Sequence, residues 1–465
     1  MFAIIAAKDL RELARDGRLL WAGGLVVVLM LVALAAGWNR QVQLNSERSA
    51  GQALDYDAWL HQGDRHPHDA AEQGMHVFKP EPSLAIFDPG IGPFVGSTVW
   101  LQAHRQSEVK FRPAQDATGL QRFGELSPAW LLQVLLPLLI IVIGFNSVSG
   151  ERERGTLRQL LSLGVPVRSL LLGKAAALAS CVGVLIAPVG LAFAVLIVAR
   201  LPAGERVDVV YRIAWLAMGY GLYLGFFVFL TLAVSALVLS SRAALVLLLG
   251  FWVAATLIAP RTASEATNLL YPTPSRLDFD NRLAHDVADA GRKAWSTHFG
   301  ARTPWDPSVP LSKWGAALKV DDEAGYGALD ENFGRLWDTF ERQQRAQEWV
   351  GLVAPVVALR GLSMGLAGTD FSQHRDFSTA AEAQRRKIQA IVSEDLIEHA
   401  DRLGNAHFTY KAGSELWASV PQFHYQLPSV SFALAHHWAS LALLAVMFCL
   451  SFALAQYALS RPLMR

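Results

Sequence analysis

Long apolar stretches, separated by two long polar segments, dominate the pattern of residues along the chain. A helix needs about 20 apolar residues to cross the roughly 30 Å hydrocarbon core of a bilayer. Six stretches meet that requirement: 19–38, 129–147, 170–198, 213–239, 243–259 and 438–459. The pattern therefore predicts an all-α membrane protein with six transmembrane helices, of which helices 2–5 occupy residues 129–259.

Short basic segments indicate how these helices are oriented, because long loops cross a membrane largely regardless of charge. Basic residues stand before the first helix, in the short connections after the second and fourth, and at the C-terminus: Lys8, Arg11, Arg15, Arg18, Arg152, Arg154, Arg158, Arg168, Arg242, Arg461 and Arg465. Six crossings put all of them on one side, which is then the cytoplasm. Both termini are predicted to be cytoplasmic. Residues 1–18 are predicted to form an amphipathic helix, and residues 438–465 the sixth transmembrane helix followed by a short tail.

A further apolar stretch, residues 349–368, is not predicted to cross the membrane. Arg360 lies near its centre, where an arginine costs about 2.5–3.5 kcal/mol on insertion scales. Pro355 and three interior glycines weaken a helix there further. We interpret this stretch as a helix buried within or beneath an external domain.

Two long segments lie on the opposite, external side of the predicted bundle. Residues 39–128 begin polar and then carry many prolines and glycines, which favours turns over helix. Residues 260–437 contain charged, alanine-rich runs at 276–299, 326–350 and 378–402, which favour helices. These segments predict two periplasmic insert domains, the first mixed and turn-rich, the second mainly helical.

Composition supports a protein in contact with membrane lipids and excludes two other classes. Hydrophobic residues make up 52% of the chain and charged residues 17%, whereas soluble proteins carry about 25% charged residues. The formal net charge of +1 argues against a nucleic-acid-binding protein. Cys181 and Cys449 both lie in apolar runs, which excludes a scaffold held together by disulfide bonds.

The most informative polar segment is SGERERGTLRQLLSLGVPVRSLLLGK, residues 149–174. A charged turn precedes a short amphipathic helix on which Leu157, Leu160 and Leu161 share one face. A short helix with an apolar face, held at the cytoplasmic end of two membrane helices, suits binding in a groove on a partner. The candidate contact residues are Glu151, Arg152, Glu153, Arg154, Gly155, Thr156, Leu157, Arg158, Leu160 and Leu161. Lys174 is expected to anchor the third helix by extending its ammonium group to the membrane surface.

This order of features resembles the permease subunits of ABC transporters, specifically the type-2 exporter superfamily. The shared features are a membrane helix followed by ERERGTLRQLL, a Pro-x-Arg motif and Gly-Lys, while KDLRELARDGRLLW is similar to the amphipathic helix that precedes the first crossing in that family. The resemblance implies that residues 151–163 form a coupling helix seated in a cleft of a separate ABC ATPase, present in two copies. It also implies a second permease, identical or homologous, and a location in the bacterial inner (cytoplasmic) membrane. ATP and Mg would be bound by the ATPase, so no cofactor or catalytic site is expected in this chain.

Three external motifs resemble a subgroup of these permeases with large periplasmic inserts of unassigned function. The motifs are PHDAAEQGMHVFKP (67–80), FDPGIGPFVGSTVWLQAHRQ (87–106) and GLAGTDFSQHRDF (365–377). The resemblance implies an ATP-driven exporter of an unidentified substrate and leaves a periplasmic partner open. Two alternatives also stay open: an ABC complex that transmits motion to periplasmic partners without transport, and a membrane-anchored scaffold or sensor without an ATPase.

A histidine-rich stretch in the first external segment offers weak candidates for a metal site. Imidazole is a common metal ligand, and the stretch contains His61, His66, His68 and His76. Their spacing is irregular and no cysteine accompanies them, so ordinary polar roles are favoured and no metal site is predicted. Glu72 stands where the resemblance leads us to expect histidine, which weakens a histidine-centred role for this loop.

Overall fold

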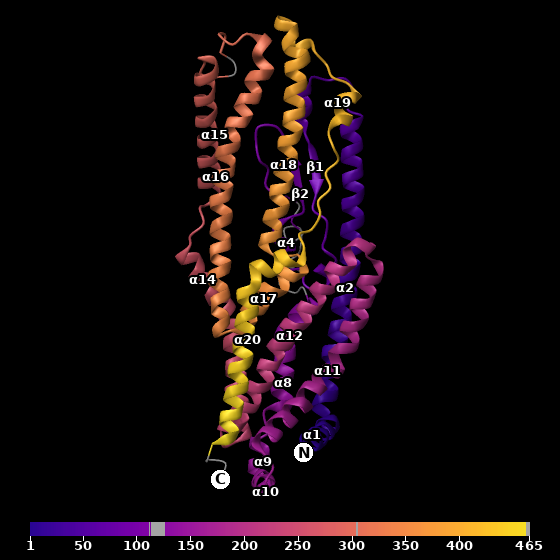
Figure 1. Cartoon of the computed structure of the whole chain (residues 1–465), viewed down its shortest axis with the longest axis vertical. Coiled ribbons are helices and arrows are strands. Elements are labelled where there is room, and N and C mark those ends of the chain that lie inside the picture. Colours follow the sequence, from indigo (N-terminus) through magenta and orange to yellow (C-terminus); the bar gives the residue numbers. More distant parts are fainter. Residues whose placement is uncertain (111, 113–125, 304–305, 462–465) are drawn as a thin grey trace.

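The computed structural model describes residues 1–465 apart from 111, 113–125, 304–305 and 462–465. The chain is elongated and largely helical, with a bundle of helices at one end and a second group of helices at the other (Figure 1). Both termini lie at the bundle end. Arg465 and part of the predicted first insert, 39–128, fall outside the described residues.

Among the described residues, six helices are long and apolar enough to cross a membrane, which confirms the predicted fold class. The candidate spans are Gly17–Leu60, Pro128–Glu153, Val167–Arg200, Ala203–Leu237, Ser241–Leu270 and Val430–Ser460. Four are single helices: α2 (Gly17–Leu60), α11 (Val167–Arg200), α12 (Ala203–Leu237) and α20 (Val430–Ser460). The second span contains α7 (Pro128–Trp130), α8 (Leu136–Gly144) and α9 (Ser149–Glu153), and the fifth contains α13 (Ser241–Trp252) and α14 (Ala259–Leu270).

Serine caps fix where two of the spans begin. The hydroxyl of Ser127 accepts the backbone N–H of Trp130 at 3.1 Å, and Pro128 occupies the first turn of α7. Ser240 accepts the N–H of Ala243 at 3.3 Å at the start of α13. Such caps satisfy backbone N–H groups that the first turn of a helix leaves unpaired, so these local sequences specify the helix starts.

Helix α2 is much longer than the predicted first crossing, 19–38. It has 44 residues, and a helix of that length extends about 66 Å, roughly twice the hydrocarbon thickness of a bilayer. Its polar half is rich in residues that favour helix, and it packs against β1 and α19. The first insert therefore begins as the continuation of a span, not as a turn-rich loop.

Helix α12 lies at the centre of the bundle. It packs against α8, α11, α20 and α17 (Pro355–Ala367). Its Tyr223 and Phe227 are buried, together with Leu131 and Ile140 of the second span, in one continuous apolar cluster. The outer spans surround this centre.

Most of the remaining elements belong to the two inserts. The first insert contains α3 (Pro67–Gln73), α4 (Gly92–Val95) and the antiparallel strands β1 (Met75–Phe78) and β2 (Thr98–Leu101), in which Met75 lies opposite Leu101. The second contains α15 (Arg276–Phe299), α16 (Trp314–Trp349), α18 (Phe371–Asp395) and α19 (Ser414–Ser419). The second insert is thus mainly helical, and α15 has the same bounds as the predicted run 276–299.

The two inserts pack against each other around one hydrophobic core. Trp59 and Val99 from the first lie in the same buried cluster as Trp314, Phe377 and Trp417 from the second. The indole N–H of Trp59 also donates to the carbonyl of Trp417 at 3.0 Å. Segments far apart in the sequence, from both predicted inserts, therefore bury their apolar side chains together.

Most of the ambiguous stretch 349–368 forms α17 (Pro355–Ala367), which is not among the candidate spans. Its apolar residues Val356, Leu359 and Leu362 are buried in the same cluster as the spans, because α17 packs against α12 and α20. The Nε of Arg360 donates a hydrogen bond to the side-chain oxygen of Gln133 at 3.3 Å. This helix thus lies beneath the inserts and on top of the bundle (Figure 1).

Candidate functional site

The polar segment between the second and third spans folds into two short helices at the end of the molecule that holds both termini (Figure 1). We call residues 149–164 the α9–α10 segment, where α10 is Thr156–Ser162. The turn between the helices depends on Gly155, whose φ of +76° lies in the left-handed region that favours glycine. Gly164, at φ +75°, follows the end of α10 in the same way. The predicted charged turn and short amphipathic helix, 151–163, correspond to this segment.

A buried ion network holds the segment to the neighbouring helices. Lys174 of α11 is 2% exposed, and its Nζ lies 2.9 Å from a carboxylate oxygen of Glu151 and 2.9 Å from one of Asp9. Asp9 belongs to α1 (Phe2–Arg15). Lys8 adds a contact of 3.1 Å to Glu151; although burial disfavours its ammonium, the Glu151 and Asp9 carboxylates raise the pKa of Lys8. The expectation that Lys174 extends to the membrane surface is therefore wrong, because the lysine is paired inside the protein.

The Gly-Lys pair at the start of the third span has a physical explanation in this network. Helix α1 packs against α11, and a Cβ atom on Gly173 would lie 2.8 Å from the Cγ2 of Ile5. Glycine permits the close approach of the two helices, and the adjacent Lys174 then reaches Asp9. Sequence reasoning missed Asp9 and this role of Lys174, although a charged residue within an apolar stretch is a signal for a specific partner.

A second set of hydrogen bonds ties the segment to α12 and α13. The guanidinium of Arg152 donates to the carbonyls of Ala236 and Val238, both at 2.6 Å. The carboxylate of Glu153 accepts the backbone N–H of Ser241 at 2.7 Å. These hydrogen-bond partners lie at the end of α12 and the start of α13, so movement of α9 would carry both helices with it.

The predicted leucine face points partly into the protein. Leu157 is 2% exposed and belongs to the apolar cluster of the bundle, while Leu160 and Leu161 are half-buried against that cluster. Glu151 is 3% exposed. The side chains of Glu151 and Leu157 thus make contacts inside the protein. They hold the segment in place and do not form part of its outer surface.

The outer surface of the segment is formed by other predicted residues and by one that was not predicted. Glu153, Arg154, Gly155 and Arg158 are exposed, and Arg152 and Thr156 are half-buried. Leu163 is 75% exposed. This surface therefore combines charged side chains with one prominent leucine, whose place after the predicted leucine face gave no signal in the sequence.

A buried polar network fastens the inserts to the bundle. The Asp88 carboxylate accepts a hydrogen bond from the Ser363 hydroxyl of α17, which also lies 3.0 Å from the Tyr220 hydroxyl of α12. Gln133 of the second span donates to Tyr220 at 3.0 Å and accepts from Arg360. Burial raises the pKa of Asp88. The network joins two spans, α17 and the first insert. Its side chains come from separate parts of the chain.

His437 links the last span to the second insert. Its ring nitrogens lie 3.0 Å from a carboxylate oxygen of Glu348 and 2.9 Å from one of Asp370, and its side chain is fully buried. Two carboxylate acceptors fit the cationic imidazole, in which both nitrogens donate. The helix α20 departs from helical geometry at this residue. A Cβ on Gly365 would lie 2.2 Å from the ring, so glycine is required for the close approach of α17.

A cavity of about 830 Å³ lies where the spans meet the inserts. Its walls include Trp38 and Gln41 of α2, Arg200 of α11, Arg212 of α12 and Tyr425. The guanidinium of Arg212 also donates to the carbonyl of Leu366 at 3.0 Å. Glu81, Glu205 and Asp208 also line it, so the cavity offers apolar surface together with charged groups of both signs next to the bundle.

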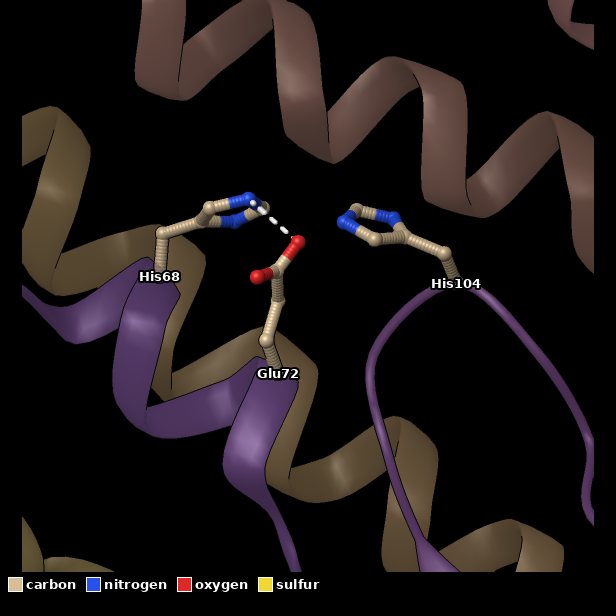
Figure 2. A group of neighbouring side chains, drawn as sticks. All are labelled: His68, Glu72 and His104. Atoms are coloured by element: carbon tan, nitrogen blue, oxygen red, sulfur yellow. Dashed lines mark ion pairs between the residues drawn. The ribbon is translucent and has the colours of Figure 1, made fainter.

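The structure brings one of the four predicted histidines into a group that could hold a metal ion. His68, Glu72 and His104 place one ligand atom each within 4.8 Å of one another, and Figure 2 shows their side chains converging from α3 and from the loop after β2. Burial and the nearby His104 lower the pKa of His68. The hydrogen bond from His104 to Asp322 raises the pKa of His104 despite its burial. Sequence reasoning missed His104 because it lies far from His68 along the chain.

The other three histidines have separate surroundings. His61 is exposed and lies 3.1 Å from the Asp57 carboxylate, and His76 lies 2.9 Å from the Asp55 carboxylate. His66 packs against the rings of His407 and Trp314, and burial lowers its pKa to about 4. Among the described residues, none of these three joins a group of potential metal ligands.

Comparison with known protein families gives a match that spans nearly the whole chain. Residues 3–462 match the family described as ABC-2 family transporter protein. No curated relative matches the sequence. Six candidate spans, a central α12 and a short helical segment joining the second and third spans all fit a membrane subunit of this kind. The chain therefore belongs to the ABC-2 family and is a transmembrane subunit of an ABC transporter, a family that implies an ABC ATPase as partner.

Proposed function

We propose that the chain is the permease subunit of an ATP-driven exporter of the bacterial inner membrane, and that the α9–α10 segment is the docking site for its ATPase. The observation that carries this proposal is the combination of an exposed outer surface with attachments to four helices, of which those through Lys174 are buried. Lys174 and Asp9 tie the segment to α11 and α1. Arg152 and Glu153 tie it to α12 and α13.

These attachments supply a mechanical route from the ATPase to the bundle. A push on the outer surface of α10 reaches α11 and α1 through the ion network, and α12 through the two short hydrogen bonds of Arg152. Buried charge pairs resist separation because an unpaired charge left in the interior is costly. ATP and Mg would be held by the ATPase, present in two copies. A second permease, identical or homologous, would provide the other half of the pathway.

The cavity at the top of the bundle is the proposed place where substrate passes from the spans to the inserts. Its volume, about 830 Å³, lies within the range of small-molecule sites, roughly 300–1,000 Å³. Its wall carries charges of both signs, because Glu81, Glu205 and Asp208 line it beside Arg200 and Arg212. Arg212 is paired with Asp208 at 2.6 Å, so the wall does not select a substrate by charge alone. The substrate itself is not identified by these residues.

The docking proposal is tested with residues on the outer surface of the segment. The tagged chain is purified from its native membrane in mild detergent, with ATP and vanadate present, and the co-purifying ATPase is quantified. Leu163→Asp and Arg158→Glu should each reduce the amount of ATPase recovered. The first puts a charge where an apolar side chain makes the contact, and the second reverses a charge there. Leu157 and Glu151 are unsuitable for this test, since their burial means that substitution would disturb the chain itself.

Arg11→Glu is the matched control for the charge reversal, because Arg11 is exposed on α1 at the same end of the molecule but outside the α9–α10 segment. It should leave ATPase recovery unchanged. Full recovery of the ATPase with both Leu163→Asp and Arg158→Glu would overturn the docking site. Absence of any ATPase from the wild-type preparation would favour the scaffold or sensor alternative instead.

One structural feature favours the alternative in which motion is transmitted without transport. The single helix α2 runs from the bundle end into the core of the inserts, where Trp59 packs against Trp417. A continuous helix can carry a displacement from the bundle to the periplasmic side. Proteoliposomes containing the permease and its ATPase separate the two functions: an exporter moves substrate on addition of ATP, whereas a transmitter changes only the accessibility of the inserts.

A further inference from the structure

The His68, Glu72 and His104 group has the geometry of a partial metal site. His68 and Glu72 lie one turn apart on α3, and the Nε2 of His68 is 3.4 Å from a carboxylate oxygen of Glu72. Ligand atoms bound to one zinc ion at about 2.0–2.1 Å lie at a similar separation in tetrahedral geometry. In Figure 2 one ring nitrogen of His104 points toward the carboxylate and the ring of His68. A small movement of the exposed Glu72 side chain and the His104 ring would bring all three within bonding distance of one ion.

The second ring nitrogen of His104 is already held by a carboxylate. Its Nδ1 lies 2.8 Å from an oxygen of Asp322 on α16, and the other Asp322 oxygen accepts from Gln389 of α18 at 3.0 Å. Histidines that bind metal usually donate their other ring nitrogen to such a carboxylate, which fixes the ring orientation and strengthens the ligand. Asp322 is buried, so this arrangement is built into the core and not formed by chance on the surface.

The backbone at His104 supports the same interpretation. Its φ is +61°, and it is the one non-glycine residue with a positive φ among the described part of the chain. Non-glycine residues are uncommon in this region; they carry a local conformational cost and cluster at active sites and ligand-binding positions. Here the conformation directs the ring toward α3.

We propose that His68, Glu72 and His104 bind one divalent transition-metal ion of the zinc class, with Asp322 orienting His104. Two imidazoles and one carboxylate form a ligand set that zinc favours. The side chain of Glu72 is 59% exposed, so the ion can enter from solvent and keep a fourth, open position for water or another ligand. All three ligands belong to the first insert, and the hydrogen bond between His104 and Asp322 connects the site to α16 of the second.

The proposal is tested by zinc titration of the full-length chain in detergent, purified with a tag that contains no histidine. Wild-type protein should bind one zinc ion that depends on these residues. Asp322→Asn should weaken that binding roughly 10–100-fold, as is typical when a residue that orients a metal ligand is changed. His68→Ala and His104→Ala, which remove a ligand itself, should weaken it more. Glu72→His should retain binding, because it supplies another imidazole, whereas Glu72→Ala should lose it.

His61→Ala is the matched control, because His61 lies in the same stretch but is exposed and paired with Asp57. It should bind zinc as the wild type does. Cobalt absorption in the visible range gives a second readout, since replacing Glu72 with histidine changes the ligand set and must shift the spectrum if Glu72 is a ligand. Zinc binding that is absent from the wild type, or equal in His68→Ala, His104→Ala and His61→Ala, would overturn the proposal.

Discussion

At the scale of single residues, Lys174 determines how three helices meet. Its ammonium is buried between the carboxylates of Asp9 and Glu151, and Gly173 beside it allows α1 to pack closely on α11. A buried charge of this kind is tolerated only because it is paired. The sequence suggests that Lys174 is a membrane-surface anchor at the start of the third span. In the structure its side chain is buried in the interior.

Lys174→Met should destabilise the protein substantially, because it leaves two carboxylates facing each other in the interior. Removing one partner from a buried ion pair costs about 3–5 kcal/mol. The melting temperature in detergent should fall clearly below that of the wild type. Lys8→Met is the control, since Lys8 is half-exposed and exposed pairs contribute only about 0–1 kcal/mol. Equal melting temperatures for the two variants would show that the network does not hold the segment.

His374 should make the inserts sensitive to acid. Burial, with Lys79 and Arg112 nearby, lowers the pKa of His374 from 6.5 to about 3. The folded state then binds fewer protons than the unfolded state between these two values, so stability is complete above pH 6.5 and decreases as the pH falls toward 3. His374→Leu should make the dependence of melting temperature on pH shallower in this window, while His285→Leu, at an exposed position, should not. The same slope in both variants would contradict this origin of acid sensitivity.

At the scale of elements, the two glycines that flank α10 control the direction of this helix. Gly155 has a φ of +76°, and a Cβ placed there meets nothing within 4 Å. Alanine at this position would have enough space, but it would have to adopt the left-handed backbone conformation. That conformation costs about 1–2 kcal/mol for a residue with a Cβ atom.

Gly155→Ala should reorient α10 and reduce ATPase recovery while changing the stability of the bundle only slightly. The helix is exposed at this turn, so the strain can be relieved by a local rotation. Gly183→Ala is the control, because it also meets nothing within 4 Å but has no positive φ. Unchanged ATPase recovery with Gly155→Ala would mean that the direction of α10 is not important for docking.

The sequence predicted the ends of α15 correctly but missed the end of α2, and the difference has a physical reason. The run 276–299 gave the bounds of α15, because a serine cap begins it and Gly300, at φ +64°, ends it. The end of α2 was missed, because helix-favouring polar residues continue past the apolar part and only a change in hydropathy marked the boundary. Local signals thus specify an element where they include a start and a stop.

At the scale of the whole molecule, the arrangement predicts which surfaces lie on the same side of the membrane. The α9–α10 segment and both termini lie at one end and α15 at the other (Figure 1). We expect the first end in the cytoplasm and the second in the periplasm, in agreement with the distribution of basic residues.

Labelling with a membrane-impermeant maleimide tests this orientation. Single cysteines at Leu163→Cys and Leu277→Cys occupy positions that are 75% and 68% exposed, in a background where Cys181 and Cys449 are replaced by alanine. Intact spheroplasts should label position 277 and not 163, and inverted vesicles should give the opposite pattern. Labelling of both positions from the same side would contradict the six-span topology.

The sequence by itself determined the six crossings, the mainly helical second insert and the family, because hydropathy, helix caps and short motifs are local properties of the chain. It also placed the α9–α10 segment at the junction of two spans. Only the tertiary structure decided that the inserts share one core, that Leu157 and Glu151 face inward, and that His104 meets His68. These features join residues separated by long stretches of chain, and their partners are selected by packing and by the need to pair buried charges, which no local pattern records.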